Sequence, residues 1–153
     1  MNYLGINHVL LGVTDLERAL HFWRDLVGLP PHPRISRWLM INRCTLHFLP
    51  LPEVAPESSA FRRFQHVAFQ VNDLARAWAD LTRAGLKPFQ LELNGQETVV
   101  ERPDQLDTGS GTIFIRDPDG NLAEFIQIGR GMFAQEADPF SGSIYESRAG
   151  FIA

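Results

Sequence analysis

An internal repeat constrains the fold of this chain more than any other feature of its sequence. Residues 7–20 are NHVLLGVTDLERAL, and residues 65–78 are QHVAFQVNDLARAW. The two stretches align without a gap, so that His8 falls on His66. Other identical pairs are Asp15 with Asp73, Leu16 with Leu74, Arg18 with Arg76, and Ala19 with Ala77. Repetition at a fixed spacing indicates one supersecondary unit used twice.

Each copy of the repeat predicts a strand followed by a helix. Residues 7–13 and 66–72 are apolar and alternate, which is typical of a strand. The period of two puts His8 on one face with Leu10, and His66 on one face with Ala68. Thr14 or Asp15 then caps a helix with apolar residues at helical spacing over residues 16–27, and the second helix covers residues 74–84.

The rest of the chain predicts further strands and a division into modules. We expect strands at residues 36–42, 44–49, 86–93, 112–116 and 122–128, with a short one near 98–101. Asp117-Pro118-Asp119-Gly120-Asn121 supplies the tight turn between the last two. The predicted domains are a βαβββ module at 1–50, a proline-rich linker at 51–64, a second βαβββ module at 65–130 and a C-terminal arm at 131–153. The fold class is therefore α+β.

Charge and composition exclude several classes of partner. The 153 residues include 44% hydrophobic and 21% charged residues, ordinary values for a globular domain. The net charge of −4 gives no electrostatic footprint for nucleic acid or for an anionic membrane. The single cysteine, Cys44, cannot form an internal disulfide, and the N-terminal sequence lacks the pattern of a signal peptide. We therefore expect a cytoplasmic protein that binds neither nucleic acid nor membranes.

Four residues on predicted strands form the candidate site. His8 and His66 lie on the first strand of each module, whereas His47 and Glu124 lie on the last strand of each. A carboxylate inside the apolar run LAEFIQI is costly to bury without a partner. A metal ion would offset that cost and would explain why imidazoles occupy symmetric positions. The pattern predicts a metal site formed by His8, His47, His66 and Glu124.

The two histidine units and the stretch DPDGNLAEF resemble the vicinal oxygen chelate superfamily, also called the glyoxalase/bleomycin resistance/dioxygenase group. The resemblance covers residues 5–128 approximately. It implies two βαβββ modules that form a cupped half-barrel of mixed sheet around one divalent metal ion. It also implies that His8, His66 and Glu124 are metal ligands, and that His47 is a fourth ligand or an acid/base, which makes His47 and Glu124 the candidate catalytic residues.

Subfamilies of this group differ at positions that can be compared with this chain. Lactoylglutathione lyases have an arginine where Gly12 stands and a glutamate where His47 stands, which argues against glutathione-dependent activity. Extradiol dioxygenases and fosfomycin-modifying transferases have a tyrosine where Phe114 stands, and the transferases have a threonine at the place of Leu10. Bleomycin-type binding proteins lack the metal ligands that are present here.

The resemblance implies a metal-dependent enzyme that stabilises an enolate-like anion on a small oxygenated substrate, as a lyase or an isomerase. A non-heme Fe(II) dioxygenase is the alternative enzyme, because two histidines and one carboxylate with open positions suit Fe(II). A bleomycin-resistance-type binding protein is the alternative that is not an enzyme. The donor set suits Zn, Ni, Fe or Mn. We expect a homodimer, and the modules can pair within one chain or across the dimer.

Overall fold

The computed structural model describes residues 6–42, 44–53, 65–92, 95–107 and 109–127. Most of the predicted linker and the whole predicted C-terminal arm lie outside these residues. Two compact units make up the chain. The first contains Met1–Val67, Ala84–Leu86 and Arg116–Ala123, and the second contains Ala68–Arg83, Lys87–Ile115 and Glu124–Ala153.

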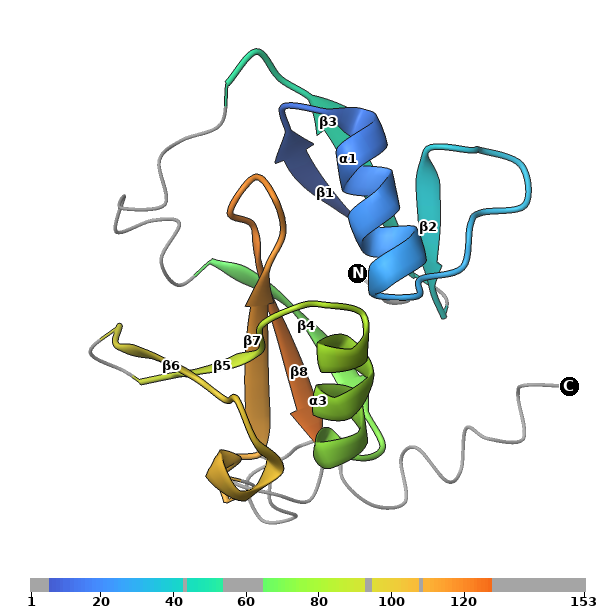
Figure 1. Cartoon of the computed structure of the whole chain (residues 1–153). Coiled ribbons are helices and arrows are strands. Elements are labelled where there is room, and N and C mark those ends of the chain that lie inside the picture. Colours follow the sequence, from blue (N-terminus) through green and yellow to red (C-terminus); the bar gives the residue numbers. More distant parts are fainter. Residues whose placement is uncertain (1–5, 43, 54–64, 93–94, 108, 128–153) are drawn as a thin grey trace, which may run out of the picture. The chain divides into compact units, whose positions relative to one another are not determined.

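The first unit contains a three-stranded sheet of order β1-β3-β2 (Figure 1). Its strands are β1 (His8–Val13), β2 (Trp38–Ile41) and β3 (Cys44–Pro50). β3 pairs parallel with β1 and antiparallel with β2. The βαβββ pattern implied three strands after the helix of the first module, and the described residues there form β2, β3 and a single bridge between Pro31 and Leu39. The prolines at 30, 31 and 33 lack the N–H groups that a longer ladder requires.

One helix covers this sheet, and it changes its winding part of the way along. α1 (Leu16–Leu20) begins at Asp15, whose Oδ1 accepts a hydrogen bond from Arg18 N at 3.0 Å. The chain continues as a π-helical segment, η1 (His21–Leu26), in which Val27 N donates to Phe22 O at 2.9 Å. The buried side chains of this helix are Ala19, Leu20, Phe22 and Trp23. The apolar stripe predicted a regular α-helix, and the wider π turn is a finding of the structure, often associated with functional positions.

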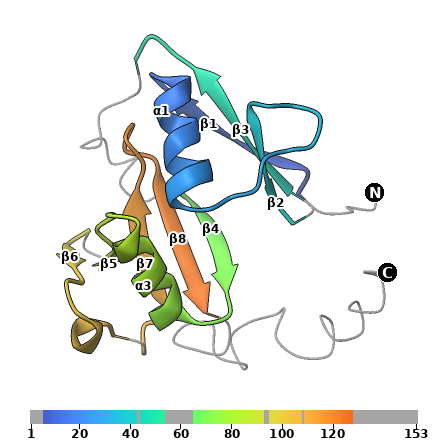
Figure 2. The same cartoon turned by 45° about the vertical axis from the view of Figure 1, so that its right-hand side comes forward.

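The second sheet has five strands in the order β4-β8-β7-β5-β6 (Figure 2). The strands are β4 (His66–Val71), β5 (Phe89–Leu91), β6 (Glu97–Val99), β7 (Thr112–Arg116) and β8 (Leu122–Gln127). β7 has its predicted limits, and the predicted hairpin connects it to β8. β5 is shorter than the predicted 86–93, because its antiparallel pairing with β6 covers three residues.

α3 (Leu74–Arg83) packs on the sheet of the second unit with an apolar face (Figure 2). Leu74, Trp78 and Leu81 are buried, and the Trp78 indole N–H donates to Val100 O at 2.8 Å. A short 3₁₀ turn, η2 (Pro103–Gln105), contacts α3. No helix among the described residues has the length and apolar character needed to cross a membrane.

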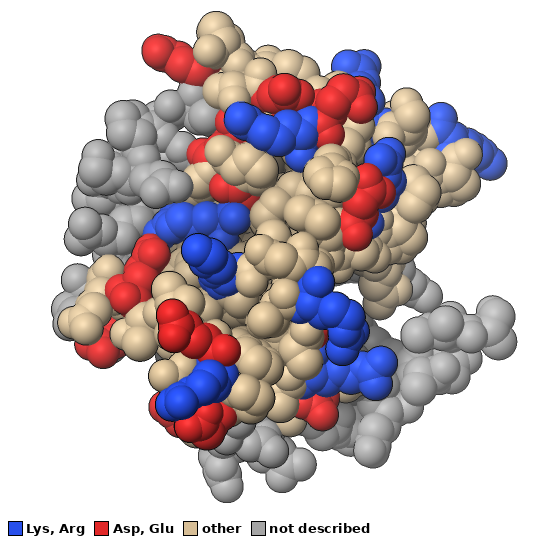
Figure 3. Space-filling view, viewed as in Figure 1, with Lys and Arg blue, Asp and Glu red and all other residues tan. Residues whose placement is uncertain are grey.

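Charges of both signs are interspersed on the face shown in Figure 3. Several of them form exposed ion pairs on one helix, such as Arg83 with Asp80 at 2.7 Å. Exposed pairs of this kind contribute at most about 1 kcal/mol each to stability. Because acidic and basic side chains are present in similar numbers, the surface is charged while the net charge stays mild.

Candidate metal centre and its supporting network

His8 and His47 lie together on one face of the β1-β3-β2 sheet. The register pairs Leu10 of β1 with His47 of β3 and His8 with Thr45, so His8 is two residues before the partner of His47 and on the same face. Their imidazole rings stack with centroids 4.4 Å apart and planes 4° apart. His8 is exposed and His47 is 8% exposed. The structure thus brings together two of the four predicted ligands.

His47 is held from two sides. Its Nε2 lies 2.8 Å from Thr45 Oγ1, and the Trp38 ring stacks on its other face at 3.6 Å between centroids. Burial lowers the pKa of His47, and the nearby imidazoles of His8 and His32 lower that pKa further. Since burial and the neighbouring imidazoles both disfavour the charged form, His47 is neutral near pH 7 and able to act as a ligand or to accept a proton.

His66 and Glu124 form a second pair on neighbouring strands. β4 and β8 are hydrogen-bonded neighbours, and Phe69 stacks with Phe125 at 5.5 Å between centroids. Because side chains alternate along a strand, the face opposite these two phenylalanines carries His66 on β4 and Glu124 on β8. His66 is exposed, while Glu124 is 6% exposed. The carboxylate is therefore buried within an apolar strand, as its sequence context indicated.

The four predicted ligands therefore form two pairs, each on adjoining strands of one sheet. The described residues contain no group of three or more His, Cys, Asp or Glu side chains spaced to hold a metal ion. His21 and His32 have other contacts. His21 Nδ1 lies 3.0 Å from Asp25 Oδ2 on the exposed side of its helix, and His32 Nδ1 accepts from Arg34 N and Ile35 N.

A cavity of about 200 Å³ lies within the first unit. Its walls come from the edge of β1, the start of β4 and the turn before β8. The lining residues are Val9, Leu10, Leu11, Gly12, Gln65, His66, Val67, Gly120, Asn121 and Leu122. One predicted ligand, His66, therefore borders this cavity.

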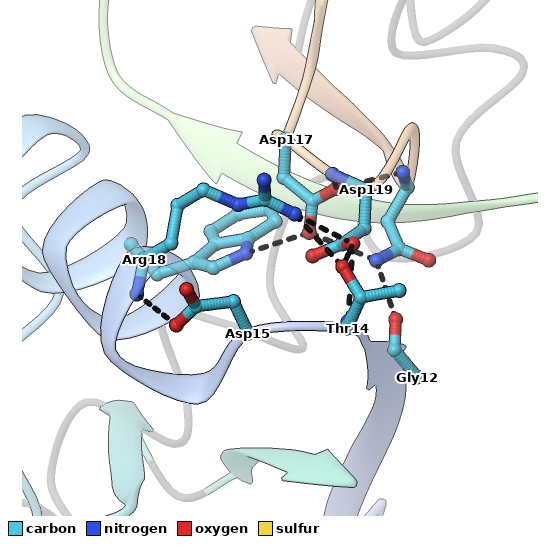
Figure 4. A network of polar contacts seen from close by, with 8 residues as sticks. Gly12, Thr14, Asp15, Arg18, Asp117 and Asp119 are labelled. Atoms are coloured by element: carbon cyan, nitrogen blue, oxygen red, sulfur yellow. Dashed lines mark hydrogen bonds and ion pairs between the residues drawn. The ribbon is translucent and has the colours of Figure 1, made fainter. Parts of the chain in front are cut away.

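The turn between β7 and β8 is organised around the carboxylate of Asp117 (Figure 4). Oδ1 accepts from the backbone N–H groups of Asp119 and Asn121 at 2.9 and 2.8 Å. Oδ2 accepts from Asn121 Nδ2 at 2.8 Å and from the indole N–H of Trp23 at 3.1 Å. Burial raises the pKa of Asp117, and these hydrogen bonds oppose that rise. Gly120 has φ of +79°, a conformation that glycine adopts without strain.

Asp119 joins the same turn to the segment between β1 and α1 (Figure 4). Its Oδ1 accepts from Thr14 N at 3.0 Å, from Thr14 Oγ1, and from Arg18 Nη2 at 3.0 Å. Arg18 Nη2 also donates to Thr14 Oγ1 at 2.9 Å. Asn121 Nδ2 donates to Gly12 O at 3.0 Å. We call this set of residues, Gly12, Thr14, Arg18, Asp119 and Asn121, the clasp.

Sequence reasoning identified the turn but missed the clasp. The motif from Asp117 to Asn121 predicts only a tight turn, and the apolar spacing over residues 16–27 predicts only a buried helix face. One signal was available, because a tryptophan in the middle of a buried stripe needs an acceptor for its indole N–H. Trp38 is a further residue that the sequence did not connect with the site, and the structure places it against His47.

Comparison with known proteins places this site in a family context. The family model described as "Glyoxalase/Bleomycin resistance protein/Dioxygenase superfamily" matches residues 5–125. The glutathione transferase FosA of Serratia marcescens is 23% identical over 145 residues, which are 94% of this chain and 96% of that protein.

Two solved structures show the same fold. The lactoylglutathione lyase of Agrobacterium tumefaciens has a TM-score of 0.54 at 18% identity, with 83% of this chain and 96% of that chain covered. TnmS3, an antibiotic binding protein from Streptomyces sp. CB03234, has a TM-score of 0.55 at 20% identity, with 83% and 98% covered. These three proteins have different functions, so the fold does not by itself assign one. The match over residues 5–125 shows that the chain belongs to the Glyoxalase/Bleomycin resistance protein/Dioxygenase superfamily.

Proposed function

We propose that this protein is a metal-dependent enzyme in which His8, His66 and Glu124 bind one divalent metal ion, with His47 as a fourth ligand or a catalytic base. Its substrate is a small oxygenated molecule, and its reaction is a lyase or isomerase step. The observation that carries the proposal is the arrangement of the four residues as two pairs, on β1 and β3 and on β4 and β8.

The donor set fits a divalent cation of the Zn, Ni, Fe or Mn type. Two imidazoles and one carboxylate leave coordination positions open for substrate oxygens. Glu124 is 6% exposed, and a buried carboxylate is stabilised by a cation. A bound ion would supply Lewis-acid stabilisation of negative charge on the substrate oxygens. A complete set requires both pairs of residues, and the modules can pair within one chain or across a homodimer.

His47 has the features of a proton acceptor. Its lowered pKa keeps the imidazole neutral, and Trp38 and Thr45 hold the ring in one orientation. In the tautomer whose Nε2–H donates to Thr45 Oγ1, Nδ1 carries the lone pair and is the atom that would accept the substrate proton. The same nitrogen could instead bind the metal.

The proposal is tested by the metal content of the purified full-length chain. Wild type prepared anaerobically with Zn, Ni, Fe and Mn present should contain close to one ion per chain by elemental analysis. His8→Ala and Glu124→Ala should lose most of it, whereas His21→Ala should keep it because His21 contacts Asp25 on the helix surface. Equal, low metal content in all four proteins would remove the basis of the proposal.

His47→Ala separates its two roles in the same assay. Loss of metal would make His47 a ligand. Full occupancy with loss of turnover would make it the base.

Two other functions have specific support. The donor set of two histidines and one carboxylate suits Fe(II) and oxygen, so a dioxygenase would show oxygen uptake that depends on Fe(II). The similarity to TnmS3, together with exposed Leu10 and Leu49 on the sheet face that carries His47, supports small-molecule binding without catalysis. Retention of ligand binding by a His8→Ala, His66→Ala double variant that lacks metal would favour that function.

A further inference from the structure

We propose that Asp119 is a positioning residue, which holds the end of β1 through the clasp and thereby places His8 relative to the cavity that His66 lines. The inference rests on the proposed function, because it concerns the geometry of two proposed metal ligands. It assigns a role to residues of the turn and of the β1–α1 segment that do not themselves bind metal.

The clasp concentrates its bonds on one buried carboxylate. The Asp119 side chain is 2% exposed, and it binds Thr14 and Arg18, which lie 105 and 101 residues away in sequence. Hydrogen bonds in which the acceptor is ionised are shorter and stronger than those between neutral groups. A single oxygen that accepts a backbone N–H, a hydroxyl and a guanidinium therefore leaves the segment after β1 little freedom to shift.

The clasp also holds the open edge of β1. Asn7 O accepts a hydrogen bond from Thr45 N of β3, and Val13 O accepts one from Leu51 N directly after β3, so the backbone of the odd-numbered residues of β1 faces β3. The alternation of a parallel ladder turns Gly12 O toward the other edge, where Asn121 Nδ2 takes the place of a neighbouring strand. Gly12 and Asn121 line the cavity together with His66. A shift of β1 would therefore change the wall of that cavity.

The second copy of the repeat forms the same strand and helix, but different side-chain contacts hold them in place. Arg76, which aligns with Arg18, forms an exposed ion pair with Asp80 at 3.6 Å. The first N–H of α3, at Leu74, is accepted by Gln127 Oε1 at 2.9 Å. The Arg18 side chain is 47% exposed, so its ion pair with Asp119 adds little net stability, and the fixing of one geometry is the better-supported role of such a contact. The buried carboxylate in the first copy therefore indicates a positioning role.

The test measures zinc affinity and the mobility of β1 in the full-length chain. Asp119→Asn should weaken zinc binding about 10-fold, the lower end of the loss seen when a residue that contacts a metal ligand directly is removed, because Asp119 acts on β1 rather than on a ligand. It should also increase amide hydrogen exchange over residues 8–14 and alter the absorption spectrum of the Co(II)-loaded protein. Arg18→Ala should weaken zinc binding in the same direction, and its matched control Arg76→Ala should leave both readouts at wild-type values.

A second set of variants keeps the test decisive if Asp119→Asn does not fold. Thr14→Val removes the hydroxyl and keeps the backbone donor, so it should weaken zinc binding, whereas Thr14→Ser should behave as wild type. If amide hydrogen exchange in β1 is faster in these variants but zinc affinity and the Co(II) spectrum are unchanged, the clasp only stabilises the fold. That result would overturn this inference and leave the proposed function standing. A wild-type protein that binds no metal would overturn the proposed function and the inference with it.

Discussion

The two copies of the repeat use the same strand, cap and helix but bury different residues. In both, an aspartate side chain accepts the N–H of the residue three positions on, at 3.0 Å from Asp15 to Arg18 and from Asp73 to Arg76. In the first copy Val13 and Ala19 are fully buried, and in the second their counterparts Val71 and Ala77 are half-buried. Local capping is thus a property of the repeat, and burial is a property of each unit.

Leu16 and Leu74 give the largest test of this difference. They are aligned first-turn residues, yet Leu74 is 0% exposed and Leu16 is only half-buried. Leu74→Ala should cost about 3 kcal/mol of unfolding free energy, through lost burial and the cavity left behind. Leu16→Ala should cost about 1 kcal/mol. Urea unfolding of the two full-length variants measures both values, and equal costs would contradict the assigned difference in burial.

The two helix tryptophans give a smaller and more specific test. Trp23 and Trp78 are both buried, but the indole N–H of Trp23 donates to the carboxylate of Asp117 and that of Trp78 to the carbonyl of Val100. Hydrogen bonds to charged groups contribute more than neutral ones. Trp23→Phe should therefore cost about 1 kcal/mol more than Trp78→Phe in the same unfolding experiment. A larger cost for Trp78→Phe would show that packing outweighs the acceptor.

The smallest expected effect is a pH dependence that belongs to the first unit. Burial raises the pKa of Asp117 above its usual value of 3.8. The folded protein therefore holds this proton more tightly than the unfolded chain does. Its contribution to stability is fully present below pH 3.8 and is lost as the pH rises through the raised pKa.

Asp117→Asn has no such proton. The unfolding free energy of wild type minus that of Asp117→Asn should therefore fall as pH rises from 3 toward neutrality. The matched difference for Trp78→Phe should stay level, because the acceptor of Trp78 is a carbonyl that does not titrate. A difference for Asp117→Asn that increases with pH would contradict the raised pKa.

Several elements could be predicted because their signals are local. The limits of β7 and the turn at 117–121 followed from alternation and from proline and glycine positions. The strand at 36–42 shortened to Trp38–Ile41, since strand length depends on how far a partner extends. The π segment at His21–Leu26 was not predicted, because an apolar stripe is compatible with either winding.

The candidate site likewise contains features that could be predicted from the sequence and features that could not. The positions of His8, His47, His66 and Glu124 on strands, and the burial of Glu124, were predicted from period and composition. The stacking of Trp38 on His47 and the clasp of Asp119 were not, because each joins groups from separate elements whose register is set by packing.

By itself the sequence determined that one strand–helix unit is used twice, that each copy carries a histidine on the same face, and that each helix begins within a residue or two of an aligned aspartate. These features depend on residues a few positions apart, whose geometry the backbone dictates. Tertiary structure alone decided that Thr14 and Arg18 meet Asp119 while Arg76 meets Asp80. Contacts between residues that are 101 and 105 positions apart depend on how the whole unit packs. No periodic pattern in the sequence marks such contacts.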